Sequence, residues 1–187
     1  YTIRTIKRLK HPNLIQYIKE RNLSLQMVQT YCKEVHYTLN DKSYYAVGFQ
    51  NDFGGFELRN KYIKMCLGKK ASTYFNNRSR NIALFESWSD YISFLTLFPN
   101  AEKQYDFLIF NSVSIIKNTI IKTSNNELFR KLQYDKIICC FDNDKAGENA
   151  ILIIKKAYTN VIDGRKLYEK HKDLNDYLLT IHYNELT

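Results

Sequence analysis

The chain has 187 residues, of which 44% are hydrophobic, and it carries a formal net charge of +9. One sizeable domain or two small ones fit this length, and the apolar content supports a hydrophobic core, which excludes a disordered chain. No signal peptide and no run of about 18 apolar residues is present, so we expect no membrane span and no membrane partner. Because the sequence begins at Tyr1 rather than at a methionine, we expect it to be a fragment.

The positive charge is concentrated in the first part of the chain. Residues 1–80 hold 15 Lys and Arg against 5 Asp and Glu, whereas residues 81–187 hold 13 against 14. A strongly basic unit of this size favours a polyanionic partner through counterion release and long-range steering, and nucleic acid is the commonest polyanion. The alternative is a lysine-rich solvated surface. Acidic residues further along the chain make nucleic acid the preferred interpretation.

The four cysteines are Cys32, Cys66, Cys139 and Cys140. They form no CxxC pair and have no histidine at the spacing of a zinc site. Cys139 and Cys140 fall in an apolar segment, as expected for free buried thiols. We therefore expect a cytoplasmic, reduced protein with no zinc in this chain.

Residues 12–34 have helical periodicity, with Pro12 suited to a first turn and Ser24 to an N-cap, which predicts two short helices. From residue 35 to 75 the pattern changes to short β segments separated by Asn, Asp and Gly. These segments are VHYTL, YYAVGFQ, GFELRN, IKMCLG and STYF. The sequence therefore predicts a small, basic, antiparallel α+β subdomain over residues 1–80.

After Arg80, apolar strands alternate with helices. The expected strands are IALFE, FLIF, KIICCF and NVID, and the expected helices cover residues 87–97, 125–132, 145–158 and 174–181. Continuous apolar strands that are each followed by a helix are typical of a parallel sheet covered on both faces. We predict an α/β, Rossmann-like domain over residues 81–187, with about four parallel strands and with ligands at their carboxyl ends.

Acidic residues recur where these strands end or helices begin: Glu86, Asp142, Asp144, Asp173 and Asp176. Carboxylates that meet at one sheet edge repel one another, so a cation stabilises such a cluster. Mg²⁺ prefers oxygen ligands, alternate carboxylates such as Asp142 and Asp144 can bracket it, and Mn²⁺ accepts the same oxygens. The alternative is that these aspartates are turn residues and helix N-caps.

Four motifs in this order resemble a Toprim domain: FESWSD at 85–90, NSVS at 111–114, FDNDKAGENA at 141–150 and KDLNDYL at 172–178. That catalytic module is shared by bacterial-type primases, topoisomerases, some nucleases and recombination mediators. The upstream segments PNLIQYIKERNLSLQMVQTY and YYAVGFQNDFGGFELRN are similar to the small basic subdomain that precedes Toprim in bacterial primases. The resemblance implies a Toprim sheet with flanking helices behind that subdomain, as in the catalytic core fragment of a DNA primase of a mobile element.

The resemblance also implies residue roles. Glu86 would be the catalytic carboxylate that assists attack by a 3′-hydroxyl, and Asp142 and Asp144 would bind Mg²⁺ that offsets charge on a triphosphate. Asp173 would complete the metal site or cap the following helix. Asp90 and Asp176 are candidates for residues that hold the ligands in place, and Asp90 could equally be a solvated helix residue.

One residue departs from the family pattern, and a further set is assigned to nucleic acid. Toprim domains usually have Gly directly after the catalytic Glu, and this chain has Ser87, which would narrow the site or alter its turn. The candidates for phosphate contact are Arg59, Lys61, Lys64, Lys69, Lys70, Arg78 and Arg80. The aromatic residues interleaved with them are base-stacking platforms or core: Tyr44, Tyr45, Phe53 and Phe56.

The expected function is that of a primase-like nucleotidyltransferase, which uses Mg²⁺ to synthesise short RNA primers on a single-stranded DNA template from nucleoside triphosphates. A helicase or a mobilisation protein is a candidate partner. One alternative is a non-polymerising Toprim protein that binds nucleic acid during mobilisation or recombination, and another is a Toprim nuclease. The chain is too short for the strand-passage gate of a topoisomerase.

Overall fold

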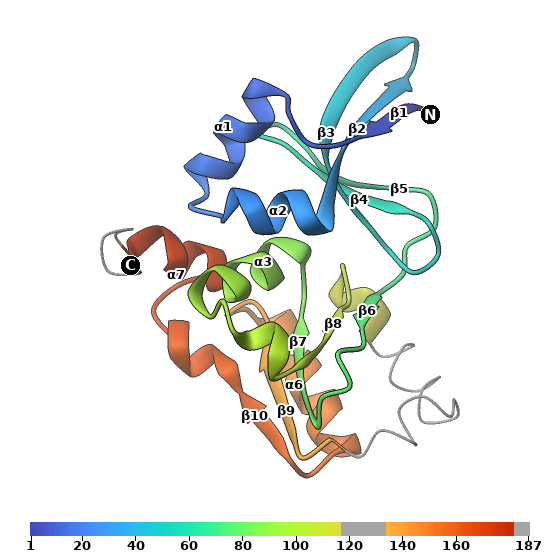
Figure 1. Ribbon diagram of the computed structural model, residues 1–187. Helices are drawn as coiled ribbons and strands as arrows, with labels where there is room; N and C mark the ends of the chain where they lie inside the picture. Colours follow the sequence, from blue (N-terminus) through green and yellow to red (C-terminus); the bar gives the residue numbers. More distant parts are fainter. Residues whose placement is uncertain (117–133, 182–187) are drawn as a thin grey trace. The chain divides into compact units, whose positions relative to one another are not determined.

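The computed structural model describes residues 1–116 and 134–181, so the predicted helix at 125–132 lies outside the described residues. The chain divides into two compact units, Tyr1–Ala71 and Ser72–Thr187. The first is drawn in blue to teal and the second in green to red (Figure 1). In the part of the chain that the structure describes, no helix has the length and apolar content needed to cross a lipid bilayer.

The first unit is an antiparallel sheet of five strands in the order β1-β2-β3-β4-β5, with two helices (Figure 1). Its elements are β1 (Thr2–Lys7), α1 (Pro12–Glu20), α2 (Leu25–Tyr31), β2 (Cys32–Leu39), β3 (Lys42–Gln50), β4 (Phe56–Arg59) and β5 (Lys64–Leu67). This confirms the predicted antiparallel α+β subdomain. Sequence analysis did not predict strand β1. Its isoleucines, Ile3 and Ile6, are three positions apart and so break the alternation of apolar residues that identifies a strand. In the structure, the pairing of β1 with β2 shifts register between Ile3 and Thr5.

Both helix starts follow the local signals in the sequence. Pro12 lies in the first turn of α1, and His11 is its N-cap, with Nδ1 accepting a hydrogen bond from the backbone N–H of Asn13 at 3.2 Å. Ser24 caps α2, and its Oγ accepts from the N–H of Met27 at 3.4 Å. The predicted roles of Pro12 and Ser24 are confirmed.

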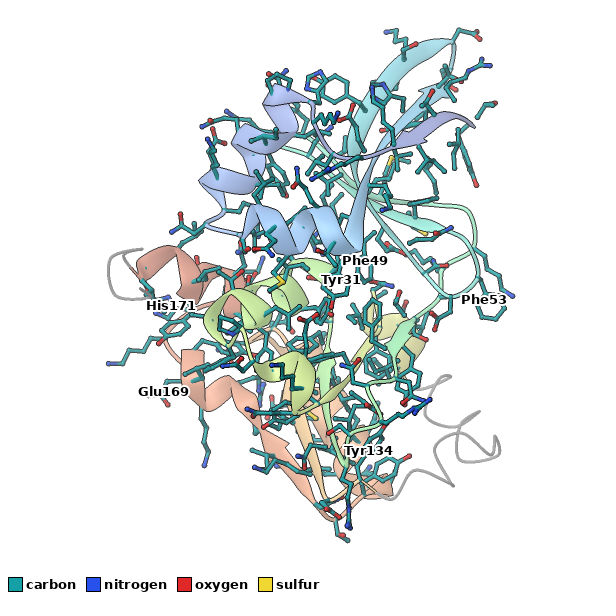
Figure 2. The ribbon with its side chains drawn as sticks, viewed as in Figure 1. Tyr31, Phe49, Phe53, Tyr134, Glu169 and His171 are labelled. Carbon is teal, nitrogen blue, oxygen red and sulfur yellow. The ribbon has the colours of Figure 1, made fainter. Side chains whose placement is uncertain are left out.

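A tight turn joins β3 to β4 and presents Phe53 at its tip (Figure 2). The buried Asn51 holds this turn: its Oδ1 accepts from the N–H groups of Phe53 (3.1 Å) and Gly55 (2.9 Å), and its Nδ2 donates to the carbonyl of Lys69 (2.8 Å). Gly54 has a φ of +77°, which favours glycine. The Lys69 ammonium lies 4.0 Å from the centre of the Phe53 ring.

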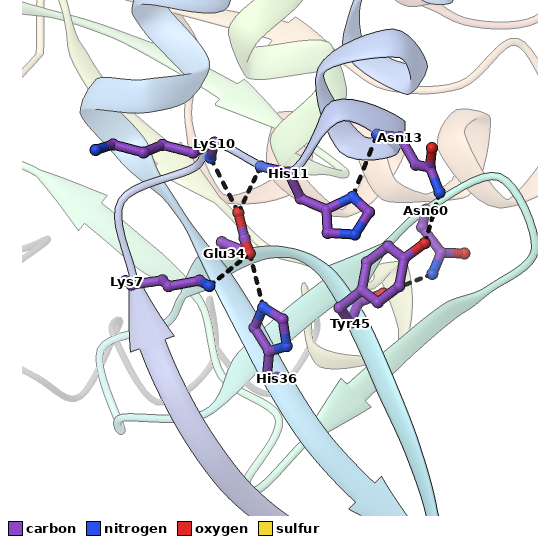
Figure 3. Close-up of polar contacts among 8 residues, drawn as sticks. All are labelled: Lys7, Lys10, His11, Asn13, Glu34, His36, Tyr45 and Asn60. Carbon is purple, nitrogen blue, oxygen red and sulfur yellow. Dashed lines mark hydrogen bonds and ion pairs between the residues drawn. The ribbon is translucent and has the colours of Figure 1, made fainter.

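Glu34 on β2 connects the strands of the first unit to the segment before α1 (Figure 3). Its side chain is 1% exposed and accepts hydrogen bonds from the backbone N–H groups of Lys10 (2.9 Å) and His11 (2.8 Å). His36 Nε2 donates to Oε1 at 2.6 Å, and the Lys7 ammonium lies 3.3 Å from the same oxygen. Every oxygen of this buried carboxylate is thus satisfied, as burial of a charge requires.

The second unit is a five-stranded sheet in the order β10-β9-β7-β8-β6. Its elements are β6 (Thr73–Phe75), β7 (Asn81–Phe85), α3 (Trp88–Leu97), η1 (Ala101–Lys103), β8 (Asp106–Ile109), η2 (Val113–Ile115), β9 (Lys136–Cys140), α6 (Lys145–Ala157), β10 (Val161–Asp163), η3 (Gly164–Tyr168) and α7 (Leu174–Thr180). Strands β10, β9, β7 and β8 pair in parallel, which confirms the predicted sheet of four parallel strands.

The segment STYF, which sequence analysis assigned to the first part of the chain, forms β6 of the second sheet. It pairs antiparallel with β8, from Thr73 with Ile109 to Phe75 with Phe107. The Tyr74 hydroxyl donates to the buried carboxylate of Asp106 at 2.9 Å, a partner that spacing along the chain did not indicate. The compact units accordingly divide at Ala71, whereas the domain boundary expected at residue 80 stays a prediction.

Helices cover both faces of the parallel strands. Ile151 and Ile154 of α6 belong to one core cluster with Ile82, Leu84 and further residues of β8 and β9. On the other face, Phe85 and Phe107 contact the aromatic rings of α3, with Phe85 5.8 Å from Tyr91 and 5.3 Å from Phe94 between ring centres. Alternate residues of each strand are therefore buried on opposite sides, which explains the continuous apolar strands.

Candidate metal centre

Two parallel strands deliver acidic residues to the same edge of the second sheet. Strands β7 and β9 are paired in register, and their last pair is Phe85 with Cys140. Glu86 follows Phe85 directly, and Asp142 comes two residues after Cys140. Because the carboxyl ends of parallel strands lie together, both side chains leave the sheet at one edge, where ligands bind in folds of this type.

Three aspartates from three different elements meet at this edge: Asp90, Asp142 and Asp173. One carboxylate oxygen of each lies within 4.8 Å of the others. Asp90, in the first turn of α3, is 4% exposed, and the other two are half-buried. Oxygens bound to one divalent cation at roughly 2.0–2.6 Å lie about 3–5 Å apart, so this donor set fits a hard cation such as Mg²⁺ or Mn²⁺.

Ser87 holds Asp90 in place. Its backbone is extended, with φ −138° and ψ 159°, so the position does not need glycine. The Ser87 hydroxyl donates to Oδ2 of Asp90, and its oxygen lies 2.9 Å from the hydroxyl oxygen of Ser89. The departure from the Toprim pattern is therefore compatible with the turn and gives Asp90 a hydrogen-bond donor.

Asp173 caps a helix and also lies in the aspartate cluster. It is the N-cap of α7, with Oδ1 accepting from the N–H of Asp176 at 2.7 Å, and it contributes a ligand atom to the aspartate cluster. The choice between cap and ligand was therefore not exclusive, because a carboxylate has two oxygens.

Helix α7 is tied to α3 by buried polar residues that sequence analysis missed. Asn175 is 0% exposed, and its Nδ2 donates to the hydroxyl of Ser93 at 3.0 Å. Ser93 in turn donates to the carbonyl of Ser89 at 2.8 Å. This chain of hydrogen bonds fixes the start of α7, and hence Asp173, relative to the first turn of α3. The local sequence signal for these contacts was that serine and asparagine occur on otherwise apolar helix faces, where buried polar groups need hydrogen-bond partners.

The other predicted carboxylates lie beside the cluster rather than in it. Asp144 is exposed and is the N-cap of α6, with Oδ1 accepting from the N–H of Gly147 at 2.8 Å. Glu86 is half-buried at the end of β7. The aspartate cluster therefore contains Asp90, whereas Asp144, which was predicted as a metal ligand, lies outside it. The assignments of Glu86 and Asp144 as catalytic and metal-binding residues stay predictions.

The loop before α7 is anchored to the end of β9. The Asn143 side chain donates to the carbonyls of Tyr168 and His171, each at 2.8 Å. Oδ2 of Asp176 accepts from the N–H of Lys172 at 3.2 Å and lies 3.6 Å from Nδ1 of His171. Figure 2 shows Glu169 and His171 on this loop. Asp176 thus braces the segment that carries Asp173.

The electrostatic environment of the edge is negative. Tyr168 is 1% exposed, and its hydroxyl donates to the carbonyl of Phe141 at 2.9 Å. Burial raises the pKa of Tyr168 above its ordinary value, and the nearby Cys140, Asp90 and Asp142 raise this pKa further. A negative potential of this kind opposes a further anion and favours a cation.

The predicted phosphate-contacting residues are distributed over both units. Arg59, Lys61, Lys64, Lys69 and Lys70 belong to the first unit, and Arg78 and Arg80 to the second. All are exposed except the half-buried Arg59. Arg80 donates to the carboxylate of Asp135 at 2.8 Å, an ion pair between exposed groups. Their role in binding nucleic acid stays a prediction.

Comparison with known protein families decides the identity of the second unit. The family described as Toprim-like matches residues 83–178, just over half of the chain. The chain belongs to the Toprim-like family. This confirms the resemblance inferred from the motifs, and it places the aspartate cluster inside the Toprim domain. A domain of unknown function (DUF8464) matches residues 3–68 in the first unit.

A solved structure shares the fold of this Toprim protein, and a second one matches more weakly. The primase fragment of the bacteriophage T7 primase-helicase protein matches with a TM-score of 0.60 at 19% identity, over 90% of this chain and 71% of that one. A chain of the bacteriophage T7 lagging-strand DNA polymerase complex with primase domains, an RNA/DNA hybrid and dTTP matches with a TM-score of 0.49 at 17% identity, over 86% and 76%. No curated protein sequence matches the chain.

Proposed function

We propose that this Toprim protein is a primase-like nucleotidyltransferase, which joins ribonucleotides into short primers on single-stranded DNA with the help of Mg²⁺ or Mn²⁺. The observation that carries the proposal is the meeting of Asp90, Asp142 and Asp173 at the carboxyl edge of the Toprim sheet. All three offer oxygen ligands at separations suited to one divalent cation. A cation bound there would offset the charge of a triphosphate.

The residues of the chain have separate tasks in this proposal. Asp90, Asp142 and Asp173 hold the cation, and the exposed Asp144 lies close along the chain to receive a second one. Glu86, at the end of β7, takes the proton of the attacking 3′-hydroxyl as a general base. Ser87 and Asn175 position the ligands through their hydrogen bonds to Asp90 and Ser93.

The basic first unit supports a nucleic-acid substrate. Its lysines and arginines would hold the phosphates of a single-stranded template by counterion release, independently of sequence. The T7 relative is described as a primase fragment of a primase-helicase protein, which agrees with primer synthesis and with a helicase partner. Replication of a mobile element in the cytoplasm, with a helicase or mobilisation protein, is the setting that we propose.

The proposal is tested by primer synthesis in vitro. The protein is incubated with single-stranded DNA, labelled ribonucleotides and Mg²⁺, and the wild type is compared with Glu86→Gln, Asp142→Asn and Asp90→Asn. We expect short RNA products from the wild type and a loss of at least about a hundredfold in each variant. Asp41→Asn is the matched control, because Asp41 is an exposed aspartate in the β2–β3 turn and lies outside the aspartate cluster, and it should retain activity.

Other products identify the alternatives. Metal-dependent shortening of the DNA, lost in the same variants, would assign the site to a Toprim nuclease. DNA binding without any product, unchanged by the substitutions, would leave a non-polymerising binding protein and would overturn the proposal.

A further inference from the structure

A cavity of about 390 Å³ lies within the first unit, between α1, β3 and the turn that joins β4 to β5. Four tyrosines contribute to its lining: Tyr17, Tyr44, Tyr45 and Tyr62. Cavities that bind small organic ligands have volumes of about 300–1,000 Å³ and combine aromatic walls with a few polar groups. The domain that contains this cavity has no assigned function.

Tyr62 is presented to solvent by a turn that is built around Asn60. The Tyr62 side chain is 86% exposed, so its ring contributes almost nothing to the core. Asn60 Oδ1 accepts from the N–H groups of Tyr62 (2.8 Å) and Ile63 (3.1 Å), and its Nδ2 donates to the carbonyl of Tyr45 (2.8 Å). The exposed ring is therefore carried by an ordered turn that is hydrogen-bonded to Tyr45 of β3.

The Tyr45 wall is fixed in advance of any ligand (Figure 3). Its ring is stacked on His11, with ring centres 3.9 Å apart and planes at 26°. Its hydroxyl oxygen accepts from Nδ2 of Asn13 at 2.8 Å, which leaves the hydroxyl hydrogen to be donated. Tyr44, the preceding residue of β3, lies on the opposite face of the sheet, where its ring is stacked on Tyr37 at 5.5 Å and is 38% exposed. Rigid rings lose little entropy when a ligand stacks on them.

We propose that this cavity is a nucleobase site. Flat aromatic faces favour stacking of any base, and the amide of Asn13 and the hydroxyl of Tyr45 offer hydrogen bonds to a base edge. Lys61 and Glu20 both line the cavity and are exposed, so the attached phosphate is attracted towards Lys61 and repelled by Glu20.

The occupant is a base of single-stranded DNA, because a strongly basic unit attracts the polyanionic strand and stacking on exposed rings is a sequence-tolerant way to hold it. A free nucleotide carries the same base, and the experiment separates these two sources. The inference goes beyond the proposed catalysis, because it uses only residues of the first unit and requires no metal.

The test measures DNA binding in the presence of EDTA, with the full chain. Fluorescence anisotropy of a labelled oligothymidylate compares the wild type with Tyr62→Ala and Tyr62→Phe. We expect Tyr62→Ala to bind about tenfold more weakly, because stacking of a single base contributes on that scale, and Tyr62→Phe to bind like the wild type. Tyr1→Ala is the matched control: Tyr1 is 61% exposed in the same unit and lies outside the cavity lining.

Photocrosslinking identifies the site directly. An oligonucleotide with 5-iodouracil should crosslink to a peptide that contains Tyr62 or Tyr44, and excess dTTP should abolish the crosslink only if free nucleotides occupy the same cavity. Wild-type affinity in Tyr62→Ala, or crosslinks only outside the cavity, would overturn the proposal. Binding is measured in EDTA, where no metal-dependent synthesis takes place, so failure of primer synthesis and failure of this site give different results.

Discussion

Ser87 is the residue at which this chain differs most informatively from the Toprim pattern. A glycine at that position would leave the buried Asp90 without the hydroxyl that now donates to Oδ2. Since the Ser87 oxygen also lies 2.9 Å from the Ser89 oxygen, the two hydroxyls form a short chain that ends on the carboxylate. This hydrogen bond fixes the position of the Asp90 carboxylate in the aspartate cluster.

Replacing Ser87 with alanine should weaken metal binding. The substitution removes the donor to Asp90 without changing the extended backbone, and loss of such an outer hydrogen bond typically lowers metal affinity by roughly 10–100-fold. Titration with Mn²⁺, followed by electron paramagnetic resonance, measures the affinity. Thr96→Ala is the control, because it removes a hydroxyl that donates to the carbonyl of Ile92 on the same helix and lies outside the aspartate cluster. Equal affinities for both variants would contradict the assigned role of Ser87.

Glu34 gives the first unit a stability that depends on pH. Burial raises the pKa of Glu34, but hydrogen bonds from His36, Lys10 and His11 outweigh burial and lower this pKa to about 2. The pKa in the unfolded chain is about 4.3, so the native state favours the ionised form. This contribution is complete above about pH 5 and is lost as the pH falls towards 2.

Glu34→Gln should therefore lower the free energy of unfolding by roughly 2–3 kcal/mol at pH 7, and the difference from the wild type should shrink as the pH falls towards 2. Urea denaturation at several pH values measures it. Asp41→Asn changes an exposed carboxylate in the β2–β3 turn and should have little effect at any pH. A difference for Glu34→Gln that stays constant between pH 7 and about pH 2.5 would show that the carboxylate charge is not responsible.

At the scale of elements, the packing of α6 against the segment that follows β9 determines where Asp142 lies. A Cβ atom on Gly147 would be 2.1 Å from the backbone oxygen of Asp142, far closer than any real contact. Only glycine lets the first turn of α6 approach the strand end this closely. The glycine in the motif FDNDKAG is thus explained by contact with the backbone of the site rather than by a special φ.

Gly147→Ala should displace Asp142 and should reduce both stability and metal affinity. We expect a loss of about 2–4 kcal/mol in the free energy of unfolding, since overpacking against backbone cannot be relieved by a rotamer change. Thermal denaturation and Mn²⁺ titration measure the two effects. Ala146→Ser alters the exposed neighbouring residue and should change neither quantity. A wild-type stability for Gly147→Ala would show that the helix can shift without cost.

At the scale of the whole molecule, the separation of charge between the two parts of the sequence predicts how DNA binding responds to salt. The logarithm of the affinity falls linearly with the logarithm of the salt concentration. The magnitude of this slope decreases by about 0.7 for each phosphate of a single strand that the protein no longer neutralises. Replacing Lys61, Lys64, Lys69 and Lys70 with glutamine should therefore reduce the slope by up to about 3. Binding is measured by anisotropy between low and moderate salt.

The matched control replaces four exposed lysines of the second unit: Lys103, Lys136, Lys155 and Lys156. It removes charge from the second unit and should leave the slope almost unchanged. An equal effect of both sets would indicate that net charge alone, rather than the basic first unit, attracts DNA.

Local patterns were sufficient to predict most elements and several site residues. The N-cap of α2 at Ser24, the parallel strands and the position of Asp142 beyond β9 follow from periodicity and from short-range capping. Asn175 and Ser93 were not found, because their hydrogen bond joins residues that are 82 positions apart. The burial of Asp90 was equally invisible, since a charged residue in a first helical turn is ordinarily solvated.

The sequence by itself determined the types of element, the excess of positive charge before residue 80 and the placement of carboxylates at strand ends, because these depend on neighbouring residues. Tertiary structure alone decided that Asp90, rather than Asp144, joins Asp142 and Asp173, and that STYF completes the second sheet. Both outcomes depend on packing between segments far apart in the chain. Such packing depends on the burial of whole faces of helices and sheets. The spacing of neighbouring residues in the sequence does not predict which faces meet.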